Sequence, residues 1–490
     1  MFGLEPRRDC EHLERFMSPA THGAAPARVL LVNLNSYDQP YPVYPVGLAY
    51  IDGALRAAGQ ESFLWDARMA TESLEECVAR YRPDFVGLSM RNIDNVQCHN
   101  PKSFIHELVG FSSRLRAATA APIILGGSGF SVFPREIFAL GGIDYGIHGA
   151  GELPFLKLVA ALRAGADEAA LGAIPGVVFR GADGAVRAVP PNAGDTAFST
   201  PPHHDPGLMA AYLAQGSLPG VQTQRGCPLH CCYCTYPLIE GDRSRFLGGE
   251  AVVAELRRLK ELGVGYVFFV DSVFNTRTDH VVEVCEALIR ADLGIQWECF
   301  LRPRGITREL LRLMQRAGLS HVEFGSDSFS DPVLRSYGKS FTFDEIRFAS
   351  EEAHALGLRY SHFIIFGGPG ETWATVEETL ARAKTLPGAY YFGTLGMRIY
   401  PETPLWRQVA PEARGESAGD YLLEPRFYIA PEFTLESLHG RLREYQKENS
   451  NWVVGDPPPA FVETMSKLRQ RGVRGPMWEY AELLQRMQGG

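Results

Sequence analysis

Apolar and polar positions alternate in blocks through the first third of the chain, and these blocks predict strands separated by helices. The run Val29–Val32 predicts a buried strand, and Val46–Ala58 repeats apolar residues at helical spacing and ends before Gly59. Further strands are predicted at residues 62–65, 85–90, 122–125 and 145–147. Because strands that alternate with helices form parallel sheets, we expect a doubly wound α/β sheet that binds its ligand at the carboxyl ends of the strands.

A second alternating block runs from Val221 to about Tyr400. Its predicted strands span residues 221–226, 266–271, 295–301, 321–326, 359–366 and 391–399. Six strand–helix units predict a partial (β/α)6 barrel of the TIM type. Chemistry is therefore expected at the carboxyl ends of these strands as well.

The remaining segments complete the predicted domain organisation. A chain of 490 residues typically forms two or three domains. The predicted parts are an extension over 1–27, a Rossmann-like domain over 28–165, a connector over 166–215, a barrel over 216–405 and a small helical region over 406–490. The connector carries a hairpin turn at 182–184 and the adjacent His203 and His204, which we interpret as solvated linker.

The composition excludes some classes of protein but identifies none. Hydrophobic residues make up 45% and charged residues 21%, as in ordinary globular proteins. The net charge of -9 argues against a nonspecific nucleic-acid binder. The chain begins without the apolar core of a signal peptide, and no apolar run approaches the roughly 18 residues of a membrane span. We expect a cytoplasmic protein.

Nine cysteines, four of them between residues 227 and 234, indicate metal binding in a reducing compartment. Cys227, Cys231 and Cys234 follow a strand-like run with the spacing C-x3-C-x2-C, which suits three thiolates around one iron–sulfur cluster. A 4Fe-4S cluster normally takes four cysteine ligands, so three leave one iron open for a small molecule. Tyr233 is suited to cover the cluster or a bound adenine, and Cys232 falls outside the pattern.

A structural zinc site is the alternative interpretation of this loop. Zinc usually takes four nitrogen or sulfur ligands, and His230 or another residue would have to supply the fourth. The surrounding chain favours the cluster.

The cysteine loop resembles that of the radical S-adenosylmethionine enzymes, in which the open iron binds the amino and carboxylate groups of S-adenosylmethionine. Three later strand ends resemble segments of the same family and imply cofactor-binding roles. After the second strand, Asp271 and Ser272 are implied as acceptors for the ammonium group of S-adenosylmethionine. After the fourth strand, Asp327 and Ser328 are implied to lie beside its ribose and methionine part.

The fifth strand is followed by Gly367, Gly368 and a Gly-Pro-Gly-Glu turn ending at Glu371, and the resemblance implies that the two glycines seat the adenine edge. Any one acidic strand end is also typical of a helix N-cap, and Thr372 partly supports that reading. Arg302 and Arg398 lie near strand ends, where they would meet a carboxylate or serve at the surface.

The N-terminal sheet resembles the cobalamin-binding domain of cobalamin-dependent radical enzymes over about residues 28–165. The resemblance rests on glycine-rich loops after successive strands, where backbone N–H groups approach a ligand closely, although each loop alone is also typical of a tight turn. The residues implied as cofactor-binding are Ser89, Arg91, Asn92, Gly126, Gly127, Gly149 and Glu152.

One departure from that family concerns the lower face of cobalamin. Domains that ligate cobalt from below use a D-x-H-x-x-G loop after the first strand, and residues 33–38 here contain no histidine. The resemblance therefore makes Arg91 or Asn92 the candidates for that face.

Together the resemblances imply reductive cleavage of S-adenosylmethionine at a 4Fe-4S cluster, with cobalamin as methyl carrier and methylation of an unactivated carbon in a natural-product or lipid-like molecule. An electron donor such as flavodoxin or ferredoxin is implied as partner. One alternative keeps the radical core but performs a rearrangement or transfers the 3-amino-3-carboxypropyl group, with a vestigial cobalamin domain. An alternative of another class is a cobalamin or metal sensor with a degenerate core. No catalytic side chain is assigned.

Overall fold

The computed structural model describes residues 25–39, 41–192, 198, 200–409, 423–455, 459–473 and 475–480. Most of the predicted N-terminal extension lies outside these residues. The chain divides into two compact units. Of the described residues, the first unit holds those up to Ser36 together with Pro45–Ile93 and Phe104–Asp205, and the second holds Tyr37–Tyr44, Asp94–Ser103 and those from Pro206 onward.

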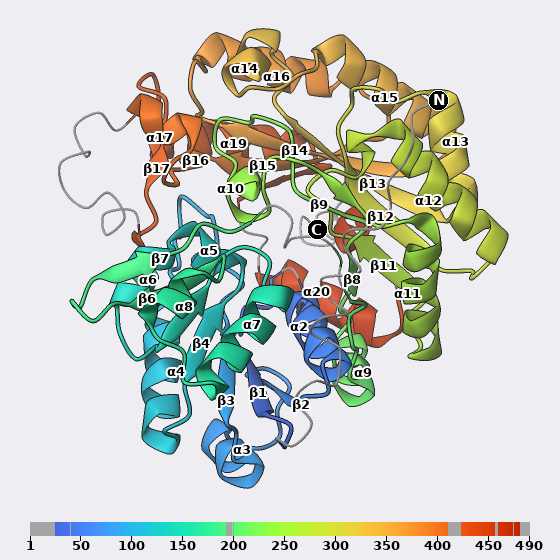
Figure 1. The fold of residues 1–490 in the computed structure, drawn as a ribbon. Coiled ribbons are helices and arrows are strands. Elements are labelled where there is room, and N and C mark those ends of the chain that lie inside the picture. Colours follow the sequence, from blue (N-terminus) through green and yellow to red (C-terminus); the bar gives the residue numbers. More distant parts are fainter. Residues whose placement is uncertain are drawn as a thin grey trace, which may run out of the picture. The chain divides into compact units, whose positions relative to one another are not determined.

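A seven-stranded sheet forms the centre of the first unit, in the order β2-β1-β3-β4-β5-β6-β7 (Figure 1). Strands β1 to β5 are parallel, and β6 and β7 join antiparallel. The predicted doubly wound sheet is confirmed. The strands are β1 (Arg28–Asn33), β2 (Glu61–Asp66), β3 (Phe85–Ser89), β4 (Ile123–Gly126), β5 (Tyr145–Ile147), β6 (Val177–Arg180) and β7 (Val186–Ala188).

Helices cover this sheet because its central strands are continuous apolar runs, buried on both faces. Val29 and Leu31 of β1 pack in one buried cluster with α2 and α7, while α3 and α4 pack against each other. The helices are α2 (Val46–Ala57), α3 (Leu74–Tyr81), α4 (Ile105–Ala118), α5 (Ser128–Val132), α6 (Pro134–Ala139), α7 (Glu152–Arg163) and α8 (Glu168–Gly172).

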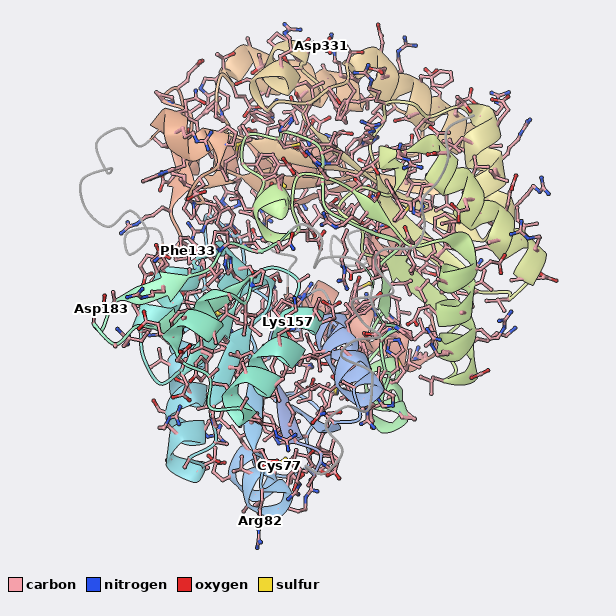
Figure 2. The ribbon with its side chains drawn as sticks, viewed as in Figure 1. Cys77, Arg82, Phe133, Lys157, Asp183 and Asp331 are labelled. Carbon is pink, nitrogen blue, oxygen red and sulfur yellow. The ribbon has the colours of Figure 1, made fainter. Side chains whose placement is uncertain are left out.

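The hairpin predicted within the connector is β6 and β7, and Asp183 lies at its turn (Figure 2). It extends the first sheet, so the first unit continues to Asp205 and takes in most of the segment expected to be linker. His203 is not a solvated linker residue, because its Nδ1 lies 2.7 Å from Asp52 Oδ2, and the side chain of Asp52 is buried.

The second unit is built on a parallel sheet in the order β18-β15-β14-β13-β12-β11-β8. Helices α11, α12, α13 and α15 follow one another along its outer side (Figure 1). Among the described residues β8 and β18 pair with no further strand, so the barrel is open. The strands are β8 (Gly220–Val221), β11 (Tyr266–Phe269), β12 (Gln296–Leu301), β13 (Leu319–Asp327), β14 (Arg359–Phe366), β15 (Tyr390–Leu395) and β18 (Trp452–Val454).

Threonine side chains cap the start of several helices in this unit. Thr307, Thr342 and Thr372 cap α13, α15 and α16, each accepting from a backbone N–H of the first turn. The helices are α9 (Pro206–Ala214), α10 (Tyr236–Ile239), α11 (Gly249–Glu261), α12 (Thr278–Ala291), α13 (Arg308–Arg316), α14 (Asp331–Ser336), α15 (Phe343–Ala355), α16 (Trp373–Ala383), α17 (Pro404–Val409), α19 (Leu435–Glu448) and α20 (Pro459–Gln470).

Two details of the barrel differ from the prediction. The C-terminal region, expected to be helical, also supplies β18, whose Trp452 stacks on Tyr391 of β15 with ring centroids 4.6 Å apart. The predicted strand 221–226 is broken into β8 and β9 (Gln224–Arg225), and β9 pairs with β10 (Arg245–Phe246). A further pair joins β16 (Met397–Arg398) to β17 (Phe427–Tyr428). No helix in the described part of the chain has the length and apolar character needed to cross a membrane.

Candidate cluster and cofactor sites

The backbone of the cysteine loop is fixed at both ends. Gly226 has φ +85°, and a Cβ there would collide with the Arg243 carbonyl, so the turn into the loop requires glycine. Cys227 N donates to Gly241 O at 3.0 Å, and Cys232 N donates to Tyr337 O at 2.9 Å. Cys234 N donates to Cys231 O at 3.2 Å, which closes a turn between the second and third thiols of the motif.

The fourth cysteine of the loop faces a different environment. Cys232 Sγ lies 3.9 Å from Met397 Sδ and packs in a buried cluster with Val333, Tyr337 and Leu405. Burial raises the pKa of its thiol to about 12. This arrangement leaves three thiols of the loop, those of the C-x3-C-x2-C pattern, for a ligand. His230, the fourth ligand of the zinc alternative, is exposed.

The chemistry of the surroundings fits an anionic cluster. Burial raises the pKa of the Cys231 thiol, and the ammonium of Lys339 beside it opposes this shift. Burial lowers the pKa of Arg302, and the nearby Cys227 opposes that shift. Cations next to thiols favour the thiolate form, which is the form that binds iron. Among the residues that the structure describes, no three His, Cys, Asp or Glu side chains gather closely enough to hold a single metal ion.

Lys339 is the residue of this site that the sequence did not reveal. Its side chain is 8% exposed and forms an ion pair with Asp327 Oδ2 at 2.6 Å. Tyr233 donates its hydroxyl to the same carboxylate oxygen at 2.5 Å. Asp327 has φ +63° at the end of β13, in the left-handed region that non-glycine residues seldom adopt. The predicted cofactor-binding residues Tyr233 and Asp327 are therefore brought together.

Asp271 holds the strand that leads into the cysteine loop. Its carboxylate accepts from Thr223 N at 2.7 Å, Thr223 Oγ1 at 2.6 Å and Gln224 N at 3.0 Å. These bonds take the backbone of Thr223 out of the sheet and explain the break between β8 and β9. Burial raises the pKa of Asp271 to about 7, against the lowering effect of the bonds from Thr223 and Gln224.

Three buried polar atoms at the carboxyl ends of the barrel strands have no partner in the structure. They are Ser272 Oγ after β11, Arg302 Nε after β12 and Glu371 Oε1 after β14. Buried polar groups are normally hydrogen-bonded, so each is an available donor or acceptor for a bound molecule. A hydroxyl, a guanidinium N–H and a carboxyl oxygen suit a zwitterionic, hydroxyl-rich ligand such as S-adenosylmethionine.

The turn after β14 has the shape that its glycines predict. Gly367 has φ +85°, and its N–H donates to Glu371 Oε2. Gly368 N donates to the Tyr337 hydroxyl at 3.1 Å, and a Cβ on Gly368 would collide with that ring. Burial raises the pKa of Glu371 to about 8.

Two residues near these strand ends are engaged within the protein. Ser328 is buried, and its Oγ accepts from Ser330 N at 3.1 Å and lies 3.3 Å from Thr379 Oγ1. Arg398 forms an ion pair with Asp94 at 2.8 Å in which both side chains are 1% exposed. Arg398 thus meets a carboxylate of the protein itself and has no surface role.

A pair of acids lies inside the barrel. Glu298 of β12 and Glu323 of β13 are both buried, and Trp478 Nε1 donates to Glu323 Oε1 at 3.2 Å. Burial raises the pKa of Glu323 to about 7 and that of Glu298 well above its usual range. Glu323 pairs in register with Phe300, two residues after Glu298, so the two acids come close only through the register of β12 and β13.

The predicted cobalamin residues gather at the carboxyl end of the first sheet. Ser89 pairs with Gly126, and Ser128 Oγ donates to Arg91 O at 2.7 Å. Gly127 has φ +103°, and a Cβ there would collide with the Met90 carbonyl. Only glycine allows this turn to lie against the loop after β3.

A small hollow that opens to solvent lies beside these loops. Arg91 and Asn92, the candidates for the lower face of cobalamin, line it together with the loop after β1. Gly149, with φ +83°, donates its N–H to Ser131 Oγ at 3.0 Å, and Glu152 is buried at the start of α7. The glycine loops let the backbone approach a ligand placed over the strand ends.

Comparison with known families identifies the class of each unit. Residues 221–383 match the radical SAM superfamily, and residues 38–159 match the B12 binding domain. The chain therefore combines a radical SAM domain with a B12 binding domain, and the resemblance predicted from the sequence is confirmed. With it the expected cofactor classes are confirmed: a 4Fe-4S cluster with S-adenosylmethionine, and cobalamin.

Particular relatives extend this result. The chain is 25% identical over 454 residues to the tryptophan 2-C-methyltransferase of Streptomyces laurentii, covering 79% of this chain and 75% of the relative. It is 32% identical over 271 residues to an uncharacterized methyltransferase of Pyrococcus horikoshii, covering 54% and 57% of the two chains. Its fold matches that of the radical S-adenosylmethionine methyltransferase TsrM from Kitasatospora setae with a TM-score of 0.82 and 23% identity, covering 94% of this chain and 99% of that one.

Proposed function

We propose that the protein is a cobalamin-dependent radical SAM methyltransferase that methylates a carbon atom of a small biosynthetic molecule. Support comes from the two domains and from methyltransferases among the relatives. The observation that carries the proposal is a three-thiol loop next to three unpartnered buried polar atoms at the ends of the barrel strands. When bound, a reduced cluster supplies an electron to S-adenosylmethionine, and cobalamin carries a methyl group.

The residues of the chain then have distinct tasks. Cys227, Cys231 and Cys234 hold the cluster, and Asp271 fixes the strand that carries them. Ser272, Arg302 and Glu371 offer hydrogen bonds to S-adenosylmethionine.

The first sheet has separate tasks. Ser89, Gly126, Gly127 and Gly149 let the backbone approach cobalamin, and Arg91 or Asn92 faces it from below, across the hollow. The expected partner is a low-potential electron donor such as flavodoxin or ferredoxin, because the cluster must be reduced by one electron. The eight described cysteines are all free, which suits the reducing cytoplasm.

Product analysis tests this function. The protein is loaded anaerobically with iron, sulfide and cobalamin, reduced with titanium(III) citrate, and supplied with S-adenosylmethionine carrying a deuterated methyl group and a metabolite extract of the encoding organism. We expect S-adenosylhomocysteine or 5'-deoxyadenosine, and a small molecule that gains the deuterated methyl group.

The other outcomes separate the alternatives. Formation of 5'-methylthioadenosine would indicate transfer of the aminocarboxypropyl group and would overturn methylation. S-adenosylmethionine cleavage without a labelled product in cobalamin-loaded protein would favour a rearrangement. Absence of every cleavage product from cluster-loaded protein would contradict an enzyme and favour a sensor.

A further inference from the structure

The backbone just before Lys339 packs against the cysteine loop. Asp331 begins α14 (Figure 2), and the helix ends two residues before Gly338. Gly338 has φ +74°, and a Cβ there would collide with the His230 carbonyl. Because Tyr337 O also accepts from Cys232 N, residues 337–339 and the cysteine loop lie against each other. The position of the Lys339 side chain is therefore fixed by the loop it faces.

The ammonium of Lys339 lies in a confined setting. It is paired with Asp327 at 2.6 Å, donates to Gly325 O at 3.3 Å, and lies 5.7 Å from the centre of the Tyr233 ring. The pair is neutral as a whole, so it is tolerated in a dry site where a lone charge would be costly. Tyr233, between two cysteines of the triad, is bonded to the same carboxylate and links the pair to the loop.

The two charges lie at the backbone that carries the thiols, and they have opposite signs. Lys339 follows Tyr337 and Gly338, which contact the cysteine loop at Cys232 N and the His230 carbonyl. Asp327 is bonded to Tyr233 of the same loop. A cluster held by these thiolates becomes one charge more negative when it takes up an electron, so each charge has a defined effect on that step.

We propose that Lys339 and Asp327 are positioning residues that set the reduction potential of the cluster in opposite directions, with Lys339 favouring the reduced state and Asp327 opposing it. This inference rests on the proposed function, because it requires the cluster. In the step concerned, one electron passes from a low-potential donor to the oxidised cluster, the donor is oxidised by one electron, and no bond forms or breaks.

The test measures the midpoint potential of the reconstituted cluster by titration with titanium(III) citrate, followed by absorbance and electron paramagnetic resonance. S-adenosylmethionine is left out, so any role of Asp327 in binding it does not enter. Iron and sulfide contents are measured first. The variants are Lys339→Met, Asp327→Asn and the double variant, with Lys339→Arg to test rescue by charge. Lys384→Met is the matched control, because Lys384 is exposed and lies over the ring of Tyr445.

We expect Lys339→Met to lower the midpoint potential, Asp327→Asn to raise it, and the double variant to lie between them. Lys339→Arg and Lys384→Met should stay near the wild type. A purely structural pair would lose iron in both single variants without shifts of opposite sign. Single variants that shift in the same direction, or an Asp327→Asn cluster whose potential does not rise, would overturn the inference.

The test still decides the question if one variant binds no cluster. If Lys339→Met holds no iron, the sign of the shift in Asp327→Asn and the rescue in Lys339→Arg decide the question. A wild-type protein that binds no cluster would instead contradict the proposed function. A wild-type cluster that cleaves S-adenosylmethionine but whose variants lack the opposite shifts would contradict this inference alone.

Discussion

The strand ends of the barrel and those of the first sheet are built in different ways. At the barrel end, acidic side chains are buried, as for Asp271, Asp327 and Glu371, each no more than 3% exposed, and Asp327 forms an ion pair with Lys339. At the end of the first sheet the backbone of Gly126 and Gly127 forms the surface, and the side chain of Arg91 is exposed. The same parallel topology thus carries a site of buried carboxyl groups in one unit and an open, glycine-lined surface in the other.

This difference follows the chemistry of the two ligands. A small charged cofactor at a cluster needs donors and acceptors held in a dry setting, where each charge has a large effect. A macrocycle needs area and close backbone approach. We therefore expect substitutions at the barrel end to act on charge and reactivity, and substitutions at the sheet end to act on binding.

The largest effect is expected at the thiols. Cys231→Ala should lose most cluster iron and all cleavage of S-adenosylmethionine, because it removes one of three thiolates. Cys232→Ala should keep both, at a cost in stability of roughly 1 kcal/mol from lost packing against Met397. Iron and sulfide analysis with product detection checks this pair, and equal iron loss in both variants would contradict the assignment of the triad.

The next largest effect is expected at the buried ion pair in the second unit. Arg398→Ala leaves the Asp94 carboxylate buried without its partner and should destabilise the protein by about 3–5 kcal/mol. Replacing both residues, as in Asp94→Leu with Arg398→Met, should cost much less. Chemical denaturation measures both variants, and a double variant as unstable as Arg398→Ala would show that the pair contributes net stability.

A pH-dependent effect is expected at Asp271. Its pKa is about 7 in the folded protein and lower when unfolded, so the folded state binds the proton more tightly. The stability from this group is complete below about pH 4 and is lost as the pH rises through 7, by up to about 4 kcal/mol. Asp271→Asn does not titrate, so the wild type should lose stability relative to it between pH 4 and 7. A constant difference across this range would contradict the prediction.

The smallest effect is expected at the first sheet. Gly127→Ala places a Cβ against the Met90 carbonyl at φ +103° and should cost about 2 kcal/mol and weaken cobalamin retention, while iron content stays unchanged. Gly110→Ala is the matched control, since it lies in α4 with open space around it. Loss of iron in Gly127→Ala would show that the cobalamin site and the cluster site are not independent, against this prediction.

The sequence predicted the elements better than the contacts between them. Alternating strands and helices defined both parallel sheets, and the cysteine spacing defined the loop. The break at Thr223 was not predictable, because it depends on hydrogen bonds to Asp271, 48 residues away. The pairing of Arg398 with Asp94 joins residues 304 apart and draws the Asp94–Ser103 segment into the second unit.

Lys339 shows the same limit at the cluster site. It follows a short helix and has no motif around it, and only the packing of Tyr337 and Gly338 on the cysteine loop brings it to the thiols. Side chains that act through charge need no fixed spacing from the cysteines, so a sequence pattern does not reveal them. The strand β18 was missed for a related reason, since three residues between helices carry little periodicity.

The most direct measurement is the electron paramagnetic resonance spectrum of the reduced, reconstituted protein with and without S-adenosylmethionine. Three thiolates that leave one iron open predict a 4Fe-4S signal that changes when S-adenosylmethionine binds, and that is absent in Cys231→Ala. A 4Fe-4S signal that S-adenosylmethionine leaves unchanged, or protein that takes up zinc but no iron, would contradict an open iron at this loop.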